Sequence, residues 1–359
     1  MKNVCIVLRN VKNSVFEPNF VSVTDALISG GYFSDEIVLL PYDAVGEFHA
    51  KIRSFLNDAD SICIITDKIL TDGVKRNLEG TFSLSFSDGF TATAKKTLIC
   101  VLPAGEEGKN IVSEKIISAL NDRLHNCYAR MVVRMVGAPR ETVETVLSEA
   151  YAVGGDAMGF NFTDNYSDQR LEVIYDSVTP KMAADRVMRI ILGELNEYVY
   201  DLDDTSLEKR VSEGLRLRKF RLASAESFTG GRISARIVSV SGASEIFDEG
   251  LNTYSNEAKM RRLGVKAETL KRYGAVSKQT AHEMAEGLFT TGGCDVCVAT
   301  TGIAGPLSDS TTKPVGLCYI AVGVKGNIFV NEYHFCGDRE QITQTAVNQA
   351  LFSLYKLLK

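Results

Sequence analysis

Apolar residues recur along this chain in short continuous runs, and stretches with helical spacing separate these runs. In the first segment, residues 1–125, strand-like runs lie at 3–8, 35–40, 61–66 and 96–102, with helical patterns at 19–29, 45–56 and 110–124. Buried strands that alternate with helices of this length are typical of a parallel sheet with helices on its faces. We therefore expect a parallel-sheet α/β domain in this segment.

Two further segments follow. In residues 126–200 the runs at 132–136, 157–162 and 170–175 alternate with helical patterns from Glu141 and Lys181, which gives the order βαββα of a small α+β domain. Residues 201–359 return to an α/β pattern. Its strands are expected at 221–225, 250–254, 295–301, 315–324 and 328–335. Its helices are expected from Thr205, at 232–238, 256–263 and 278–288, and from residue 338 onward. The chain is thus predicted to be a multidomain α/β protein.

Composition and charge narrow the class of protein. The 359 residues are 45% hydrophobic, which is enough for several buried cores. A net charge of −5, with both signs mixed along the chain, argues against a nucleic-acid or membrane partner. The first apolar run is too short for a signal peptide, and no run is long enough to span a bilayer. Cysteines that stand mostly inside apolar runs are typical of a reducing compartment, so we expect a cytoplasmic protein.

Cys294 and Cys297 have the spacing of a redox or metal-binding pair. They stand at the start of a predicted strand, on which residues three apart point to opposite faces. No second cysteine or histidine pair stands at metal-ligand spacing. Core packing is therefore the preferred interpretation, and we expect no metal site.

Ser227 stands between an apolar strand and the start of a helical pattern, and Thr229, Gly230 and Gly231 follow it. Two glycines let backbone N–H groups approach a ligand closely, and a helix N-terminus favours an anion. Such a turn can hold a phosphate, or an oxyanion next to the serine hydroxyl. The alternative is an ordinary glycine-rich turn in which Ser227 caps the helix.

Lys259 is the candidate base for this serine, since the chain has only four histidines. With Asn256 as the expected N-cap, Lys259 falls in the first turn of a helix, where a cation gains nothing from the helix dipole. Burial there lowers the pKa of a lysine, and only the neutral amine can take a proton from serine. The alternative is a solvated lysine on a charged helix.

Three more features could complete the site. Tyr254 ends the preceding strand, and its hydroxyl could donate to the serine or to a substrate. Thr301, Gly302 and Gly305 leave the end of an apolar strand, where ligands gather in open α/β sheets. Arg339 opens the last helix and could hold a phosphate through its planar guanidinium, although a surface ion pair is the alternative.

Together these residues resemble the carboxy-terminal domain of the CinA (competence/damage-inducible protein) family, which is a nicotinamide-nucleotide amidase domain. The matching stretches keep the family's order and spacing over almost all of residues 201–359: Ala225–Gly231, Tyr254–Lys259, Gly274–Ser277, Thr301–Pro306, Lys313–Gly316 and Gly337–Arg339. The resemblance implies hydrolysis of nicotinamide mononucleotide to nicotinate mononucleotide and ammonia, in pyridine-nucleotide salvage and without a cofactor or metal. It places the nucleophile on Ser227, the base on Lys259 and supporting roles on Tyr254, Thr301 and Arg339.

The resemblance also implies how a substrate would be bound. The turn at Thr229, Gly230 and Gly231, or that at Gly302 and Gly305, would supply N–H groups for the oxyanion, and Arg339 would hold the 5′-phosphate. A homodimer is expected as well. Two departures concern the fit of the substrate rather than the nucleophile. Phe228 replaces the usual cysteine, and residues 307–312 lack the family's glycines and the glutamate of its Glu-Lys-Pro.

The first segment resembles the family's molybdopterin-binding-type domain in outline only, and the middle segment resembles its small KH-type domain. The usual Gly-Gly-Leu-Gly-Pro-Thr run, tied to metal-dependent ADP-ribose pyrophosphatase activity, is replaced here by Thr66–Gly73. Asp67 and Asp72 in this stretch could bind a metal, but loop aspartates are more often turn formers. We therefore predict that this domain has lost the activity.

The KH-type segment has Gly137–Arg140 in place of a Gly-x-x-Gly loop, so RNA binding is not expected. Two alternatives to the amidase remain open at this point. One is a non-catalytic nucleotide-sensing or interaction protein of the same fold, which the altered first domain favours. The other is a dual enzyme that also cleaves ADP-ribose, which rests on the analogy of fold alone.

Overall fold

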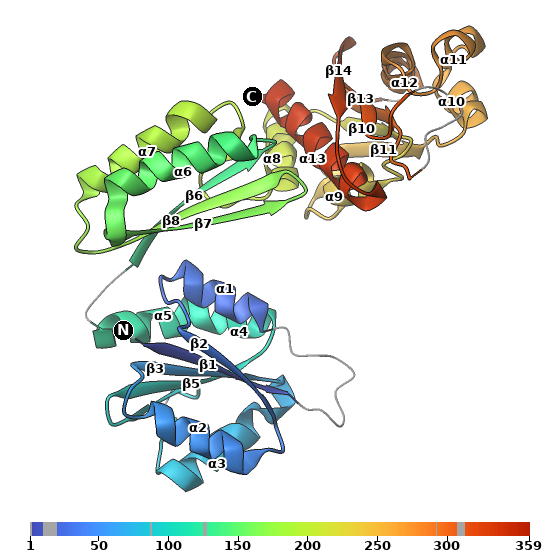
Figure 1. The fold of residues 1–359 in the computed structure, drawn as a ribbon. Helices are drawn as coiled ribbons and strands as arrows, with labels where there is room; N and C mark the ends of the chain where they lie inside the picture. The colour runs from blue at the N-terminus through green and yellow to red at the C-terminus, as the bar shows by residue number, and fades with distance from the viewer. Residues whose placement is uncertain (1, 10–19, 87, 125–127, 292, 307–312) are drawn as a thin grey trace. The chain divides into compact units, whose positions relative to one another are not determined.

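The computed structural model describes residues 2–9, 20–86, 88–124, 128–291, 293–306 and 313–359 (Figure 1). The chain divides into two compact units. The first comprises Met1–Arg130, Gly154–Gly159 and Val173–Ala184, and the second comprises Met131–Val153, Phe160–Glu172 and Asp185–Lys359. Within the described residues, no helix combines the length and the apolar character needed to cross a bilayer.

The first unit is built on a five-stranded sheet with the order β2-β1-β3-β5-β4. The strands are β1 (Asn3–Arg9), β2 (Glu36–Pro41), β3 (Ser61–Thr66), β4 (Thr91–Ala94) and β5 (Thr97–Pro103). All pairs are parallel except β4 with β5. The predicted parallel sheet is confirmed, and the short antiparallel edge strand β4 is an addition to it.

Helices cover both faces of this sheet because alternate residues of its buried strands point to opposite sides. Ile6 packs with residues of α2 (Val45–Phe55) and α3 (Thr71–Phe82). Its neighbour Val7 packs with residues of α1 (Val21–Ser29) and with Val112 and Ile116, which lie in a π-helical turn between α4 (Glu106–Ile111) and α5 (Ile117–Leu124). The continuous apolar runs of the sequence are therefore strands buried on both faces.

The stretch Thr66–Gly73, for which the sequence predicts a loop, has a regular structure. Asp67 precedes a single 3₁₀ turn at Lys68–Leu70, and Asp72 lies in the first turn of α3. The Asp72 side chain is 80% exposed and pairs with Lys75 at 3.6 Å. The loop interpretation is thus wrong for Asp72, because a helix begins at Thr71 that the sequence pattern did not reveal.

A four-stranded sheet with the order β7-β8-β6-β9 follows along the chain. Its strands and helices run in the order β6 (Tyr128–Val136), α6 (Arg140–Gly154), β7 (Met158–Asn165), β8 (Asp168–Asp176), α7 (Lys181–Leu195) and β9 (Val199–Asp201). The predicted βαββα order is confirmed, and the short β9 is an addition to it. Ala138 lies in the connection between β6 and α6. The side chain of Gln169 on β8 donates to its carbonyl and accepts from its N–H, which fixes this connection.

The last sheet positions the candidate site. Its order is β11-β10-β12-β13-β14, in which β11 (Phe247–Asn252), β10 (Leu222–Glu226) and β12 (Val296–Gly302) are parallel. The strands β13 (Leu317–Val324) and β14 (Asn327–His334) extend it in antiparallel fashion. The carboxyl ends of β10 and β12 are neighbours, and crevices at such ends bind ligands in open α/β sheets.

Helices again cover both faces of this sheet (Figure 1). One face packs against α8 (Leu207–Arg218), α9 (Arg232–Val238) and α13 (Arg339–Leu358), through residues such as Leu222 and Val298. The other face packs against α10 (Asn256–Leu263) and α12 (Lys278–Thr291), through Ala223 and Ala299 among others. Along the chain, α11 (Ala267–Tyr273) stands between α10 and α12, and the sequence did not predict it.

The two cysteines with C-x-x-C spacing belong to this second face. Cys297 is fully buried, and Cys294 packs at the edge of the same apolar cluster. The Cys294 thiol donates to the carbonyl of Leu288 at 3.5 Å, and burial raises its pKa to about 11. The interpretation of this pair as core residues is confirmed.

Candidate active site

Ser227 is held at the carboxyl edge of the last sheet. It follows directly after the final residue of β10, and its backbone N–H donates to the carbonyl of Thr300 on β12 at 3.1 Å. Its side chain is buried, and the turn that it begins leads into α9. The predicted strand–turn–helix setting of this serine is therefore present in the structure.

Lys259 reaches the serine from the helix that follows β11 along the chain. It lies in the first turn of α10, as expected, but the N-cap of this helix is Ser255 rather than Asn256. The Ser255 hydroxyl accepts from the N–H of Ala258 at 3.1 Å, and Asn256 is the first residue inside the helix. Lys259 is only 1% exposed, so the alternative of a solvated lysine is wrong.

The amino group of Lys259 has three oxygen neighbours. Its Nζ lies 2.9 Å from Oγ of Ser227, 2.8 Å from the carbonyl oxygen of Thr253 and 3.0 Å from that of Tyr254. No carboxylate within the described residues forms an ion pair or hydrogen bond with it. Burial lowers the pKa of Lys259 to about 8, because the charged form loses hydration without gaining a counter-ion.

This set of neighbours orients the neutral amine. A neutral amine has two N–H donors and one lone pair, and a carbonyl oxygen can only accept a hydrogen bond. If the carbonyls of Thr253 and Tyr254 take the two N–H groups, the lone pair is left for the hydroxyl of Ser227. The geometry therefore suits proton transfer from the serine to the lysine.

The glycine turn after the serine is closed by hydrogen bonds of its own. The N–H of Gly230 donates to the carbonyl of Ser227 at 3.2 Å, and the N–H of Gly231 donates to Oε2 of Glu226 at 3.0 Å. Thr229 is fully buried, and its hydroxyl is bonded to that of Thr300. These groups are thus bonded within the turn or to β12.

A cavity of about 250 Å³ opens beside the serine and the lysine. Seven of the predicted site residues line it: Ser227, Tyr254, Lys259, Thr301, Gly302, Gly305 and Arg339. Thr229, Gly230 and Gly231 are not among its lining residues. The volume is close to the lower end of the range for ligand pockets, so it suits one small ring or group rather than a whole dinucleotide.

Neither Tyr254 nor Thr301 forms a hydrogen bond to Ser227 through its hydroxyl group in the described part of the chain. Tyr254 contacts Lys259 through its backbone carbonyl, while its side chain is 65% exposed at the cavity. Thr301 is buried, and its hydroxyl donates to the carbonyl of Ala275 at 2.8 Å. Thr301 therefore fixes the turn between α11 and α12, which forms another wall of the cavity.

Phe228, which stands where the family usually has cysteine, packs against Gly302. A Cβ atom added to Gly302 would lie 2.8 Å from the Phe228 ring and 2.7 Å from Sγ of Cys318. The ring belongs to an apolar cluster with Ala304 and Ile342. The close approach of the aromatic ring thus requires glycine at position 302.

Arg339 lies at the mouth of the same cavity. It is the first residue of α13, and its Nη1 donates to the carbonyl of Gly305 at 2.8 Å. Gly305 has a φ of +79°, which favours glycine. This bond uses one N–H group and leaves others of the exposed guanidinium for a ligand. The altered loop at 307–312, on which the sequence showed a departure, lies outside the described residues.

Two residues outside the predicted set also shape the site. Glu226 is a buried carboxylate directly before the serine, and Lys313 donates from its Nζ to the carbonyl of Tyr273 at 2.7 Å and to that of Val276. Lys313 thereby holds the same turn that Thr301 holds. The sequence could have indicated Glu226, because it is a charged residue at the end of an apolar strand. A charge that is buried in such a place needs hydrogen-bond partners.

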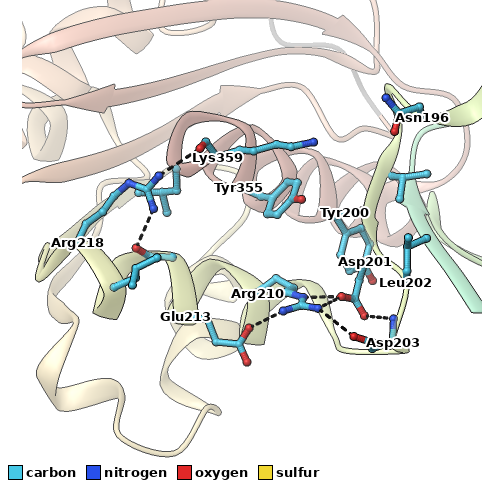
Figure 2. Close-up of a pocket in the computed structure, with 14 residues that line it drawn as sticks. Asn196, Tyr200, Asp201, Leu202, Asp203, Arg210, Glu213, Arg218, Tyr355 and Lys359 are labelled. Atoms are coloured by element: carbon cyan, nitrogen blue, oxygen red, sulfur yellow. Dashed lines mark hydrogen bonds and ion pairs between the residues drawn. The ribbon is translucent and has the colours of Figure 1, made fainter. Parts of the chain in front are cut away.

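A larger cavity, of about 660 Å³, lies elsewhere in the second unit, between α8, β9 and the end of α13 (Figure 2). Its central cation, Arg210, is paired with Asp201 and with Glu213, the latter at 3.0 Å. Among its 14 lining residues, all of them described, none is a serine, cysteine or histidine. It therefore offers no serine or cysteine nucleophile. The smaller cavity holds a serine beside a buried lysine and is the candidate active site.

Comparisons with known proteins show the family to which the chain is similar. The sequence model of the CinA C-terminal domain matches residues 204–358. A protein of Caldicellulosiruptor saccharolyticus, provisionally named competence-damage inducible protein, is 39% identical over 237 residues, which cover 64% of this chain and 56% of that protein. A protein of the same provisional name from Clostridium botulinum (strain Okra) is 33% identical over 285 residues, which cover 76% of this chain and 67% of that protein.

A solved structure is similar as well. The CinA superfamily protein of Klebsiella pneumoniae is 36% identical, with a TM-score of 0.42, over 42% of this chain and 95% of that protein. Fold and site together define a mixed-sheet α/β protein with a buried serine–lysine pair at the carboxyl edge of the sheet. Because the identity to the Clostridium botulinum relative extends over two thirds of its length, the chain belongs to the CinA family of competence/damage-inducible proteins.

Proposed function

We propose that this chain hydrolyses the carboxamide of nicotinamide mononucleotide to nicotinate mononucleotide and ammonia. The observation that carries the proposal is the 2.9 Å contact between Oγ of Ser227 and Nζ of Lys259, with no carboxylate bonded to the lysine in the described part of the chain. A buried lysine with a pKa of about 8 is neutral in a useful fraction of molecules near neutral pH. This pair can therefore activate a serine without histidine.

Binding would use the two ends of the cavity. The nicotinamide ring fits the volume of about 250 Å³ beside Ser227, and the exposed Tyr254 ring lies at its edge. The guanidinium of Arg339 at the mouth is suited to the 5′-phosphate, since charge-assisted bonds from arginine to phosphate are strong and directional. The phosphate would thus place the carboxamide against the serine.

In the first chemical step, Oγ of Ser227 attacks the carboxamide carbon and its proton passes to Nζ of Lys259. The negative charge that develops on the amide oxygen needs preorganised N–H donors. Phe228 and Ala304 line the cavity, and their backbone N–H groups donate to no acceptor in the described part of the chain. They are the donors that we assign to the oxyanion. The N–H of the residue after the nucleophile has this role in other serine hydrolases.

Collapse of the tetrahedral intermediate breaks the C–N bond. Lys259 returns its proton to the leaving nitrogen, so that ammonia departs and a nicotinoyl ester remains on Ser227. A water molecule then attacks the ester carbonyl and gives its proton to the neutral Lys259. Lys259 passes this proton to Oγ of Ser227 as the ester bond breaks, which restores the serine hydroxyl. The released acid loses its own proton to water and leaves as the carboxylate. Lysine thus alternates between acceptor and donor, which a pKa near the working pH permits.

Release of ammonia from nicotinamide mononucleotide tests the proposal. We expect turnover by the wild type, and loss of at least about 1,000-fold in Ser227→Ala and in Lys259→Met, since each removes a member of the pair. Lys266→Met is the matched control, because Lys266 is exposed in the loop after the same helix. A wild type no faster than Ser227→Ala would refute the amidase.

A further inference from the structure

The geometry points to Glu226 as the positioning residue of the nucleophile: its buried carboxylate closes the turn that presents Ser227. The inference concerns the serine itself and rests on the proposed function only through the role of Ser227 as a nucleophile. Glu226 is 1% exposed and forms no ion pair with a basic side chain in the described ranges. A charged group in such a position has to be satisfied by hydrogen bonds.

Four donors from one side of the turn satisfy this carboxylate. Oε2 accepts from the N–H of Gly231 at 3.0 Å and from that of Ile233 at 3.1 Å. Oε1 accepts from the N–H of Ser234 at 2.9 Å and from its hydroxyl at 2.7 Å. Three of these donors are backbone N–H groups at the start of α9, which have no partner inside the helix. The helix N-terminus that the sequence suggested for a ligand anion is therefore occupied by the protein's own carboxylate.

These bonds join the two ends of the turn. The turn leaves β10 at Glu226, passes through Ser227 and enters α9 after Gly231, so the carboxylate bridges its first residue to its last. The opposite side is fixed by the β-sheet, since the N–H of Ser227 donates to Thr300 on the neighbouring strand. The serine is thus held between two rigid elements, as a preorganised nucleophile has to be.

The surrounding residues leave room for this arrangement. The hydroxyl of Ser234 lies 2.8 Å from that of Ser224 on β10, which continues the chain of hydrogen bonds away from Glu226. A Cβ atom added to Gly250 on the neighbouring strand would lie 2.3 Å from Oγ of Ser234. The glycine at position 250 is therefore what allows Ser234 to reach the carboxylate.

Glu226→Gln is the sharpest test, because glutamine keeps the length and shape but replaces one acceptor oxygen with an NH₂ group. That group would face two donors and lose both hydrogen bonds. A displacement of Ser227 by about 1 Å costs about 100-fold in rate. We expect kcat for nicotinamide mononucleotide to fall about 100-fold, with KM within about twofold, because Glu226 does not line the cavity.

A second readout does not depend on the amide substrate. A fluorophosphonate transfers its phosphoryl group to an activated serine; the P–F bond breaks, fluoride leaves and the serine proton goes to the base. With full-length protein, the rate constant for labelling Ser227 should fall in Glu226→Gln to a similar degree, while the final fraction of labelled chains stays at the wild-type level. A merely destabilised protein would instead lose labelled fraction at an unchanged rate, and that result would overturn the assignment.

Glu283→Gln is the matched control, since Glu283 also accepts from a backbone N–H and a hydroxyl, those of Lys266 and Thr269 at 2.9 and 2.7 Å, away from the cavity. It should label at the wild-type rate. If Glu226→Gln does not fold, Ser234→Ala tests the positioning role instead. It removes only the hydroxyl donor, one of the four, and should slow labelling of Ser227 several-fold.

The outcomes for the two proposals are separable. A wild type that labels on Ser227 but releases no ammonia overturns the proposed substrate and leaves the role of Glu226 to the labelling rates. Equal labelling rates in Glu226→Gln and the wild type overturn the positioning role, whatever the substrate is. A wild type that neither labels nor releases ammonia overturns both.

Discussion

The pH dependence of turnover should follow the titration of Lys259. Burial lowers the pKa of this lysine from an ordinary 10.5 to about 8. The neutral fraction is then about 1% at pH 6, about 9% at pH 7 and about 90% at pH 9, whereas an exposed lysine would be only about 0.03% neutral at pH 7. Burial in this site thus raises the concentration of active base at pH 7 by about 300-fold, which corresponds to about 3 kcal/mol.

The direction of the dependence follows from the role of the group. Because the neutral amine is the base, kcat/KM should rise about tenfold per pH unit between pH 6 and 7.5 and level off above pH 8.5. Lys259→Arg should be inactive across this whole range, since a guanidinium keeps the charge and the donors but cannot lose its proton.

The assay is ammonia release from nicotinamide mononucleotide at constant ionic strength, with fluorophosphonate labelling of Ser227 as a parallel measurement. Both profiles should share one midpoint near pH 8, as they depend on the same base. A flat profile, or a rate that still climbs tenfold per unit at pH 10, would refute the argument that burial tunes this lysine. An active Lys259→Arg variant would refute its role as the base.

Three further substitutions test the walls of the cavity. Arg339→Ala should raise KM for nicotinamide mononucleotide about 10- to 100-fold with little change in kcat, and it should leave KM for the riboside without phosphate unchanged. Thr301→Val removes the hydrogen bond to Ala275 and should lower kcat more than it raises KM, which steady-state kinetics will show. Phe228→Ala leaves a void beside Gly302 and should lower the local stability of β12 and β13 by about 3 kcal/mol, measured by hydrogen exchange; full protection would contradict this packing.

Much of the fold follows from local pattern. The runs at 61–66 and 256–263 correspond to β3 and α10 without a shift, because a strand buried on both faces is continuously apolar and an amphipathic helix has a regular period. The strands and helices that the sequence did not predict include α3, α11, β4 and β9, which are polar or short. Their positions depend on packing against neighbours rather than on a pattern of their own, so the local sequence carried little signal for them.

The cap of α10 shows the same limit on a smaller scale. Asn256 and Ser255 are both good N-caps by residue type, and the sequence favoured Asn256. The structure uses Ser255, whose extended backbone lets its hydroxyl accept from Ala258. Lys259 lies in the first turn of α10 with either N-cap. The prediction for Lys259 is therefore correct although the predicted N-cap is one residue too late.

The sequence by itself determined which groups are available. Ser227, Lys259, Thr301 and Arg339 could be named as a set because strands, turns and helix starts have local signatures, and all four line one cavity. What the sequence could not determine is how each group is used, because hydrogen bonds depend on distances between segments far apart in the chain. Only the tertiary structure showed that Tyr254 contributes its carbonyl rather than its hydroxyl.

The turn at Gly230 and Gly231, which leads into α9, shows the difference between a local property and one that the fold decides. A helix N-terminus attracts an anion wherever it occurs, and the sequence could state that much. Which anion reaches it depends on the fold, and here the carboxylate of Glu226 accepts from its N–H groups. Burial of Lys259 is likewise a property of the packed unit and not of its helix. The sequence therefore determined the reactive groups, and the tertiary structure decided their environment, which sets their chemistry.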